Sequence, residues 1–532
     1  MTTKKWTVLL TLLFVLTVGL SKEPTHLLIL TVAQMVLVPV MLVQLLGRNK
    51  FLYSAILIST VCVMALQISK DTEWEIVFAG GYLLYTIVIA CFGFLRFLKR
   101  GFMHIEEFMI DAAMMYLAIG GMWFFASVAE LNTGFSPMIT WLTAIHFHYA
   151  SFLLPVFSGL LGRLYKPKYY SAIAALLLIS PLLTAVGISF SVWIEFLSVL
   201  TYILAIYGLV LLTGKAKFIS PAQALLVRVS IGSIGITIIF SLLYVLSNAI
   251  GLLTIDIPFM LLFHGVTNCL LFGLVGVIGW SLTIPNPKQL PDIPVSQIRG
   301  GTVIGEQGIQ PYFSNRPVKG LVDDMSLYQV DSISKTIQDF YENTVEYRLF
   351  SEVIWKKWFK PFAYIYTRTT KYVKQLNLPY RRKRVEMTGT VRAISENKDG
   401  RKSPRAWIRK IGDEEVFIAL YSKHVSNGQP YMNIALPLPK SSMMGILELK
   451  AEGDQLVLTS ESSEESDAGI YLAVGKFLPK LPISERFTVW ETQEGILKAI
   501  HKMKFCSLPF LTIHYEIFHS TNLREKSSEN PA

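Results

Sequence analysis

Apolar positions are distributed unevenly along the chain. Up to residue 283 they form runs of about 20 residues that are cut by short charged loops, whereas residues 284–532 mix apolar and polar positions. Such a run is long enough to cross a bilayer as a helix, which satisfies its own backbone hydrogen bonds there. The pattern predicts a membrane all-α bundle of about ten transmembrane helices over residues 1–283. The predicted spans are Trp6–Leu20, His26–Leu46, Leu52–Ser69, Ile76–Leu95, Phe108–Ala129, Ile139–Leu161, Ser171–Phe190, Val192–Thr213, Val227–Leu252 and Phe259–Leu282.

Lys and Arg fall on alternate connections between these spans. One set of connections carries most of them, and the other set carries Lys22, Lys70 and mainly acidic residues. Basic loops stay on the cytoplasmic side of a membrane. The asymmetry therefore predicts a multi-pass protein of the cell (inner) membrane with both termini in the cytoplasm. The basic set comprises Lys4, Lys5, Arg48, Lys50, Arg96, Lys99, Arg100, Arg163, Lys166, Lys168, Lys215, Lys217 and Lys288.

The second half of the chain predicts a cytoplasmic α+β domain. Residues 284–330 are a Pro/Gly-rich connector, residues 331–379 an amphipathic aromatic and basic helical segment, residues 380–520 a β-rich domain, and residues 521–532 a disordered tail. Closely spaced strands without intervening helices favour antiparallel pairing in a curved sheet or partial barrel, a shape that can hold an apolar ligand. The predicted strands are Val385–Ile394, Arg405–Lys410, Glu415–Ser422, Tyr431–Leu438, Ile446–Ala451, Leu456–Ser460, Ile470–Val474, Arg486–Trp490 and Phe510–Phe518, with a short helix near Thr492–Lys502.

The helical segment before the strands combines aromatic and basic residues. A helix capped by Asp331 or Ser332 and running towards Phe359 is predicted to place its aromatic residues on one stripe. Such a helix fits the surface of an anionic leaflet, and it equally fits a core position against the following sheet. The candidate membrane-surface residues are Trp355, Trp358, Lys356, Lys360, Arg381 and Arg382.

Several hydrophilic residues fall within the outer halves of the predicted spans. Ionisable groups are costly at that depth and therefore invite explanation. His146 and His148 are two residues apart, so their side chains point in nearly opposite directions on a helix and at most one of them faces a common site with His264. The candidate substrate-path residues are His146, His148, Glu195, His264 and Asn268.

This polar set is compatible with more than one chemistry. Imidazole and carboxylate groups relay protons, coordinate a polar solute or bind a transition metal, here between His146 and His264. They also serve as hydrogen-bonding groups between helices, which leaves the metal and any cofactor open. Glu107 and Asp111 lie at the inner end of their span and are predicted to be wetted interface residues.

The composition limits which binding partners we expect for this chain. The chain is 52% hydrophobic and 16% charged, with a net charge of +11 that is spread over short loops and one juxtamembrane run. Membrane lipids fit this distribution better than nucleic acid does, because no nucleic-acid motif accompanies the basic residues. The second half carries no phosphate-binding loop, nucleophile elbow or metal-ligand helix, so no soluble enzyme is predicted.

Longer motifs resemble the YndJ-like family of bacterial membrane proteins. The resemblance extends over roughly residues 100–518 and implies a bacterial inner-membrane protein, without implying catalytic residues or a cofactor. The segments that carry it are His146-Phe147-His148-Tyr149-Ala150, His264-Gly265 with Asn268, Phe340-Tyr341-Glu342-Asn343-Thr344, Asp399-Gly400-Arg401, Arg405-Ala406-Trp407-Ile408-Arg409 and Tyr431-Met432-Asn433-Ile434-Ala435-Leu436-Pro437-Leu438-Pro439.

These observations predict a transporter or permease-like membrane protein with a cytoplasmic ligand- or lipid-sensing domain and a small-molecule solute. Two alternatives stay open: a membrane-embedded lipid-modifying enzyme that uses intramembrane His and Glu195, and a membrane-anchored lipid-binding module. The oligomeric state is not indicated by the sequence.

Overall fold

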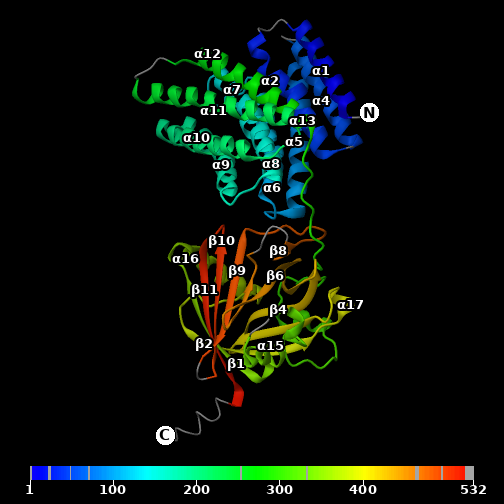
Figure 1. The fold of residues 1–532 in the computed structure, drawn as a ribbon, viewed down its shortest axis with the longest axis vertical. Coiled ribbons are helices and arrows are strands. Elements are labelled where there is room, and N and C mark those ends of the chain that lie inside the picture. Colours follow the sequence, from blue (N-terminus) through cyan, green and yellow to red (C-terminus); the bar gives the residue numbers. More distant parts are fainter. Residues whose placement is uncertain are drawn as a thin grey trace. The chain divides into compact units, whose positions relative to one another are not determined.

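The computed structural model describes residues 3–21, 25–47, 49–69, 72–251, 255–330, 333–461, 466–492 and 495–521. It divides into two compact units, which are considered separately below. The first unit consists of Met1–Phe97 and His104–Gln289, and the second of Leu98–Met103 and Leu290–Ala532. The first is helical and the second is built around a sheet (Figure 1).

The first unit is a bundle of apolar helices. Within the described residues, nine helical spans are long and apolar enough to cross a membrane, and the 18-residue helix α1 (Thr3–Leu20) precedes them. The predicted bundle of about ten spans is therefore confirmed. After α1, the elements are α2 (Ile29–Val32), η2 (Ala33–Leu37), α3 (Val38–Leu46), α4 (Lys50–Ile68), α5 (Glu75–Arg100), α6 (Ile105–Val128), α7 (Pro137–His148), η3 (Tyr149–Leu153), α8 (Leu154–Leu164), α9 (Tyr170–Phe190), α10 (Val192–Lys215), α11 (Pro221–Ile250), α12 (Ile257–Phe259), η4 (Met260–Val266), η5 (Asn268–Leu274) and α13 (Val275–Leu282).

The second unit is a closed antiparallel barrel. Among the described residues, eleven strands form one sheet in the order β5-β4-β3-β2-β1-β11-β10-β9-β7-β6-β8, and β5 also pairs with β6. Ten strands therefore close into a ring, and β8 pairs with β6 beside it, which confirms the predicted curved sheet or partial barrel. The strands are β1 (Tyr347–Trp355), β2 (Arg384–Ala393), β3 (Arg405–Ile411), β4 (Glu414–Ser426), β5 (Gln429–Leu438), β6 (Ser441–Glu452), β7 (Gln455–Thr459), β8 (Gly469–Ala473), β9 (Ile483–Glu491), β10 (Leu497–Phe505) and β11 (Leu508–His519).

Two predicted helical segments are wrong where their residues form strands. The stretch running towards Phe359 contains α15 (Lys335–Glu342) and η8 (Thr344–Glu346), but then continues as β1, and the stretch Thr492–Lys502 contains part of β10. The predicted caps Asp331 and Ser332 lie outside the described residues. In β1 the buried residues alternate, which is the period of a strand rather than a helix. This segment forms a strand rather than a helix because it pairs with both β2 and β11, which lie far along the chain, and so closes the ring.

Shorter elements cover the barrel. α15 contributes Phe340 and Tyr341 to the interior core, and α16 (Lys360–Val373) contributes Ala363. The Pro/Gly-rich connector packs Ile298 and Ile304 against residues on the outer faces of the strands, such as Ile418. The remaining elements are α14 (Gly305–Ile309), η6 (Gln310–Tyr312), η7 (Met325–Tyr328), η8 (Thr344–Glu346), η9 (Lys357–Phe359) and α17 (Glu396–Asp399). The predicted disordered tail, 521–532, lies outside the described residues apart from Thr521.

Candidate functional site

The bundle brings three of the predicted polar residues together. The His264 Nδ1 atom lies 2.9 Å from the carbonyl oxygen of Thr237 on α11, and its Nε2 lies 3.2 Å from Asn268 Nδ2. The Thr237 hydroxyl donates to Asn268 Oδ1 at 2.7 Å. His146 lies within electrostatic range of His264, and its own side chain is exposed. His146, His264 and Asn268 therefore belong to one region of the bundle.

The other two predicted residues lie elsewhere. The ring of His148 is buried, with Nε2 at 2.6 Å from the hydroxyl of Tyr82 on α5 and Nδ1 at 2.7 Å from the carbonyl oxygen of Ala144. Its partners differ from those of His146, as the two-residue spacing predicts. Glu195 stands in the first turn of α10, where its backbone packs closely against Gly187 of α9. Among the described residues, no hydrogen bond or ion pair joins its carboxylate to either histidine.

Three spans change helical pitch where they meet this region. η2, η3 and η5 are π-helical, and so is η4, which carries His264. A Cβ on Gly273 of η5 would lie 2.9 Å from Leu37 of η2 and 3.0 Å from Tyr149 of η3, so the three segments pack closely. π-Helical turns are uncommon and frequently occur at functional sites. The neighbouring polar residues therefore stand on non-standard backbone, a feature that hydropathy does not indicate.

No metal centre is formed by the residues that the structure describes. Among them, no three His, Cys, Asp or Glu side chains come together in a way that could hold an ion. His264 already uses both ring nitrogens in contacts with Thr237 and Asn268. The arrangement is that of a hydrogen-bonded polar cluster.

The carboxylates of a second polar cluster are fully buried at the start of α6. Arg163 reaches Glu107 with two hydrogen bonds of 2.6 and 2.8 Å, Arg96 reaches Asp111 at 2.7 Å, and Lys166 reaches Glu106 at 2.9 Å. The prediction of wetted interface residues is wrong for Glu107 and Asp111, whose side chains are buried. Their basic partners come from other spans. The sequence therefore offered only one indication of these buried ion pairs, which is that acidic and basic residues occur near the same ends of the spans. The cluster ties α5, α6 and the end of α8 together.

The predicted membrane-surface residues separate into two groups. Trp355 is buried in the barrel, where its indole nitrogen donates to the carbonyl oxygen of Pro379 at 3.0 Å. Trp358 is exposed at the start of the α16 region. Arg382 pairs with Glu352 at 2.9 Å. The rest of the set, Lys356, Lys360 and Arg381, is exposed or half-buried.

α16 has apolar residues that face the barrel and others that are exposed. Phe359, just before it, and Tyr366 line the barrel cavity. Phe362 and Ile365 are 57% and 66% exposed, and the ring of Phe362 also lies 5.6 Å from that of Phe359. Apolar side chains on an amphipathic helix normally pack against a partner. The described residues leave these two side chains largely uncovered.

The barrel interior contains a cavity of about 260 Å³. Its walls come from nearly every strand of the ring and are largely aliphatic and aromatic, with Phe340 and Tyr341 from α15 and Phe359 and Tyr366 beside or on α16. Apolar pockets with a few polar groups are the usual form of small-molecule sites. The charged and tyrosine side chains that the strands contribute to the lining are Arg409, Tyr421, Glu485, His501 and Tyr515.

These polar groups are arranged in pairs. His501 Nε2 lies 2.9 Å from Glu485 Oε2, on the neighbouring strands β10 and β9. Tyr515 on β11 and Arg409 on β3 line the same cavity and interact electrostatically. Burial raises the pKa of Tyr421 to about 12, so its hydroxyl stays protonated and can donate a hydrogen bond. The sequence drew attention to Arg409 only as part of the motif Arg405-Ala406-Trp407-Ile408-Arg409, and it assigned no site role to any of these residues. The signal for the cavity was the alternation that turns Trp407 and Arg409 to the same side of β3.

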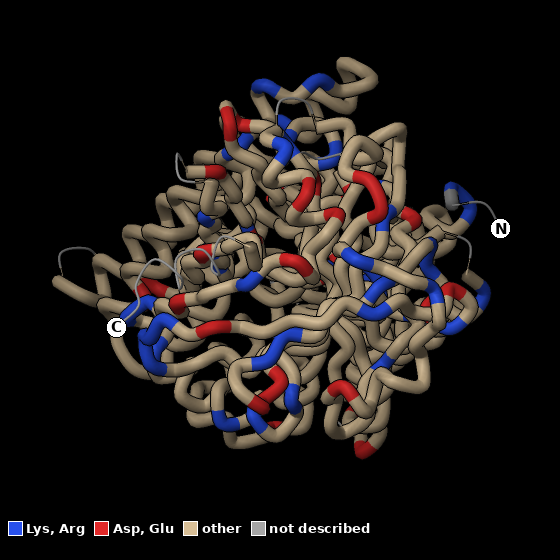
Figure 2. Tube along the Cα trace, turned by 90° about the horizontal axis from the view of Figure 1, so that it is seen from below, with Lys and Arg blue, Asp and Glu red and all other residues tan. Residues whose placement is uncertain are grey.

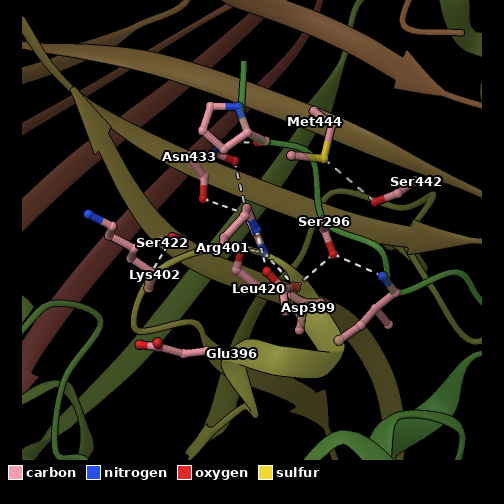
Figure 3. Close-up of polar contacts among 12 residues, drawn as sticks. Ser296, Glu396, Asp399, Arg401, Lys402, Leu420, Ser422, Asn433, Ser442 and Met444 are labelled. Atoms are coloured by element: carbon pink, nitrogen blue, oxygen red, sulfur yellow. Dashed lines mark hydrogen bonds and ion pairs between the residues drawn. The ribbon is translucent and has the colours of Figure 1, made fainter. Parts of the chain in front are cut away.

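The motif Asp399-Gly400-Arg401 forms a buried polar network on the outer side of the barrel (Figure 3). Arg401 binds Asp399 at 2.6 Å and the carbonyl oxygens of Asn433 and Leu420 at 2.9 and 3.1 Å. The Ser296 hydroxyl donates to the same carboxylate at 2.7 Å. The network fastens the connector to β4 and β5, which gives this motif a structural role.

Charged positions of both signs are mixed along the chain. Lys and Arg positions are interspersed with Asp and Glu positions on the Cα trace in Figure 2, so the net charge of +11 is not confined to one segment.

Comparison with known proteins identifies the family. The model of the family described as "YndJ-like protein" matches residues 28–272. The chain is 38% identical over 459 residues to the "Uncharacterized membrane protein YndJ" of Bacillus subtilis (strain 168), covering 83% of this chain and 84% of that protein. No solved structure matches the chain. The resemblance seen in the sequence is thus confirmed, and the chain belongs to the YndJ-like family of membrane proteins.

Proposed function

We propose that this integral membrane protein binds a lipid-like amphiphile inside the barrel of its second unit. The observation that carries the proposal is the closed ring of ten strands around an apolar cavity of about 260 Å³. Small barrels either fill their interior with side chains or hold one small ligand. A cavity of this size and lining favours the second case.

α16 provides a route between the cavity and a bilayer. Its inner side carries Tyr366, a cavity-lining residue, and its outer side carries the exposed Phe362 and Ile365. Basic residues flank the same helix, including Lys360 and Lys371. Apolar side chains flanked by basic ones suit the surface of an anionic leaflet. With the cytoplasmic orientation predicted from loop charges, this leaflet is the inner one, and the barrel takes its ligand from there.

The proposal is tested by filling the cavity. Full-length protein in detergent is incubated with dodecanoic acid, dodecanol or methyl dodecanoate and analysed by native mass spectrometry. Ala419→Trp on β4 places an indole in the cavity, and Leu447→Trp does so from β6. Val425→Trp, at an exposed position of β4, is the matched control. We expect bound amphiphile on the wild type and on Val425→Trp, and its loss from both cavity variants.

Two results contradict lipid binding in the barrel. One is a wild-type protein that retains none of the three amphiphiles. The other is retention by Ala419→Trp and Leu447→Trp at the wild-type level, since the ligand then lies outside the cavity. Thermal unfolding of each variant shows whether loss of ligand reflects loss of the fold.

A second candidate function, proton movement through the bundle, is favoured by the cluster around His264. The imidazole contacts Thr237 and Asn268, has His146 nearby, and stands on π-helical backbone. Histidines within spans are suited to proton relays. This candidate retains the predicted transporter function, with protons as the transported or the coupling ion.

Proteoliposomes with an entrapped pH-sensitive dye test this candidate. An imposed pH gradient should decay faster with wild-type protein than with empty liposomes, and His264→Ala should slow the decay. Glu195→Gln is the control, because its carboxylate is not joined to the cluster. Wild-type proteoliposomes that are as tight to protons as empty ones rule out the pathway.

A further inference from the structure

Arg409 is a buried cation inside the barrel cavity. It stands on β3, its side chain lines the cavity, and the residue is 8% exposed. Its guanidinium carbon lies 4.3 Å from the ring centre of Trp407 and 4.4 Å from that of Phe417. The two rings hold the guanidinium in place between them.

In the part of the chain that the structure describes, no acid is paired with Arg409. Among the described residues, no carboxylate lies within 4.0 Å of Arg409, and its buried Nε atom has no hydrogen-bond acceptor. The Glu485 carboxylate, which also lines the cavity, is bound to His501 at 2.9 Å. Tyr515 lines the same cavity, close enough for the guanidinium to act on its hydroxyl electrostatically. Arg409 therefore keeps donor capacity that the protein does not use.

An unbalanced cation in an apolar interior is costly. Buried charges are normally paired, because removal from water without a counter-charge is strongly unfavourable. Stacking on aromatic rings offsets part of that cost. The rest is offset if a ligand brings a negative charge, and the planar fork of Arg suits the two oxygens of a carboxylate or phosphate.

We infer that the amphiphile in the barrel is a single-chain lipid with an anionic head group, a carboxylate or a phosphate, bound at Arg409. This inference rests on the proposed lipid-binding function and specifies its ligand. The acyl chain lies along the aliphatic and aromatic lining, and Tyr515 lies beside the head group. The cavity volume of about 260 Å³ lies at the lower limit of small-molecule sites, which suits one chain rather than two.

The experiment compares charged and uncharged ligands with the same chain. Dodecanoic acid, dodecyl phosphate and methyl dodecanoate are titrated into the full-length protein and followed by native mass spectrometry. The variants are Arg409→Gln, which removes the charge, and Arg409→Lys, which keeps it without the fork. Arg348→Gln is the matched control, because Arg348 is exposed and paired with Glu386 on the outer face. Inorganic phosphate alone is a separate arm.

We expect the wild type and Arg348→Gln to prefer the charged ligands over the ester. Arg409→Gln should bind dodecanoic acid about 10- to 100-fold more weakly, the effect of one lost charge-assisted contact, while binding of methyl dodecanoate persists. The affinity of Arg409→Lys for dodecanoic acid should lie between those of the wild type and Arg409→Gln. Persistent ester binding also shows that the variant is folded.

The results that would overturn this inference differ from those that would overturn the proposed function. Equal binding of acid and ester by the wild type, or no effect of Arg409→Gln on the acid, overturns the anionic head group and leaves lipid binding standing. Absence of all three amphiphiles overturns both. Binding of inorganic phosphate through Arg409, with no amphiphile bound, replaces the lipid with a free anion and also overturns the inference.

Discussion

The buried pair of Asp399 and Arg401 gives a direct test of how the barrel is held together. The substitution Asp399→Asn keeps the size of the side chain and removes its charge. Arg401, which is 1% exposed at its side chain, then remains buried beside an amide that offers one oxygen instead of two. The Ser296 hydroxyl also loses a charged acceptor.

The expected destabilisation follows from the burial of the pair. Removing one partner of a buried ion pair costs about 3–5 kcal/mol, because the other charge stays buried. For a unit of this size each kcal/mol lowers the melting temperature by roughly 2–4 °C, which gives a fall of roughly 6–20 °C. The Arg401 contacts with the carbonyl oxygens of Asn433 and Leu420 persist and hold the loss within this range.

Thermal unfolding of the full-length protein in detergent, followed by tryptophan fluorescence, measures this fall. Glu386→Gln is the control, because it breaks the exposed pair with Arg348 and should cost less than about 1 kcal/mol. The double variant Asp399→Asn/Arg401→Met should recover about 1–3 kcal/mol relative to the sum of its single changes. A transition for Asp399→Asn within 2 °C of the control, at roughly the precision of the measurement, refutes the reasoning.

Three further outcomes are expected. Glu107→Gln should lower the stability of the bundle by about 3–5 kcal/mol in a denaturation assay, because it removes the buried counter-charge of Arg163; a fall below 1 kcal/mol contradicts this. Burial lowers the pKa of Lys480 to about 8, so between pH 8 and 10.5 the unfolded chain binds more protons than the folded protein does. The free energy of unfolding should therefore rise by up to about 3 kcal/mol as the pH increases across that window, and Lys480→Met should flatten the rise. A fluorophore on Ile365→Cys, in a variant without native cysteines and in anionic nanodiscs, should be quenched by brominated lipid, whereas one on Val425→Cys should not; equal quenching argues against membrane contact by α16.

The sequence determined most of the elements because they depend on local patterns. Runs of apolar residues are visible wherever they occur, so the spans from Leu52–Ser69 onward could be placed before the structure. Alternation and turn residues likewise predicted most strands of the barrel, such as Tyr431–Leu438 within β5. The opposite directions of His146 and His148 also followed from helical spacing alone.

Only the tertiary structure decided which residues meet. β1 is a strand because Leu349 pairs with Met387 on one side and Ile517 on the other, although its aromatic residues also fit a helical stripe. The same holds for charge: Glu107 pairs with Arg163 from another span, whereas Arg409 is paired with no carboxylate among the described residues. The physical reason is that burial, pairing and charge balance are sums over neighbours in space. Residues tens to more than a hundred positions apart supply those neighbours, and periodicity along the chain carries no information about them.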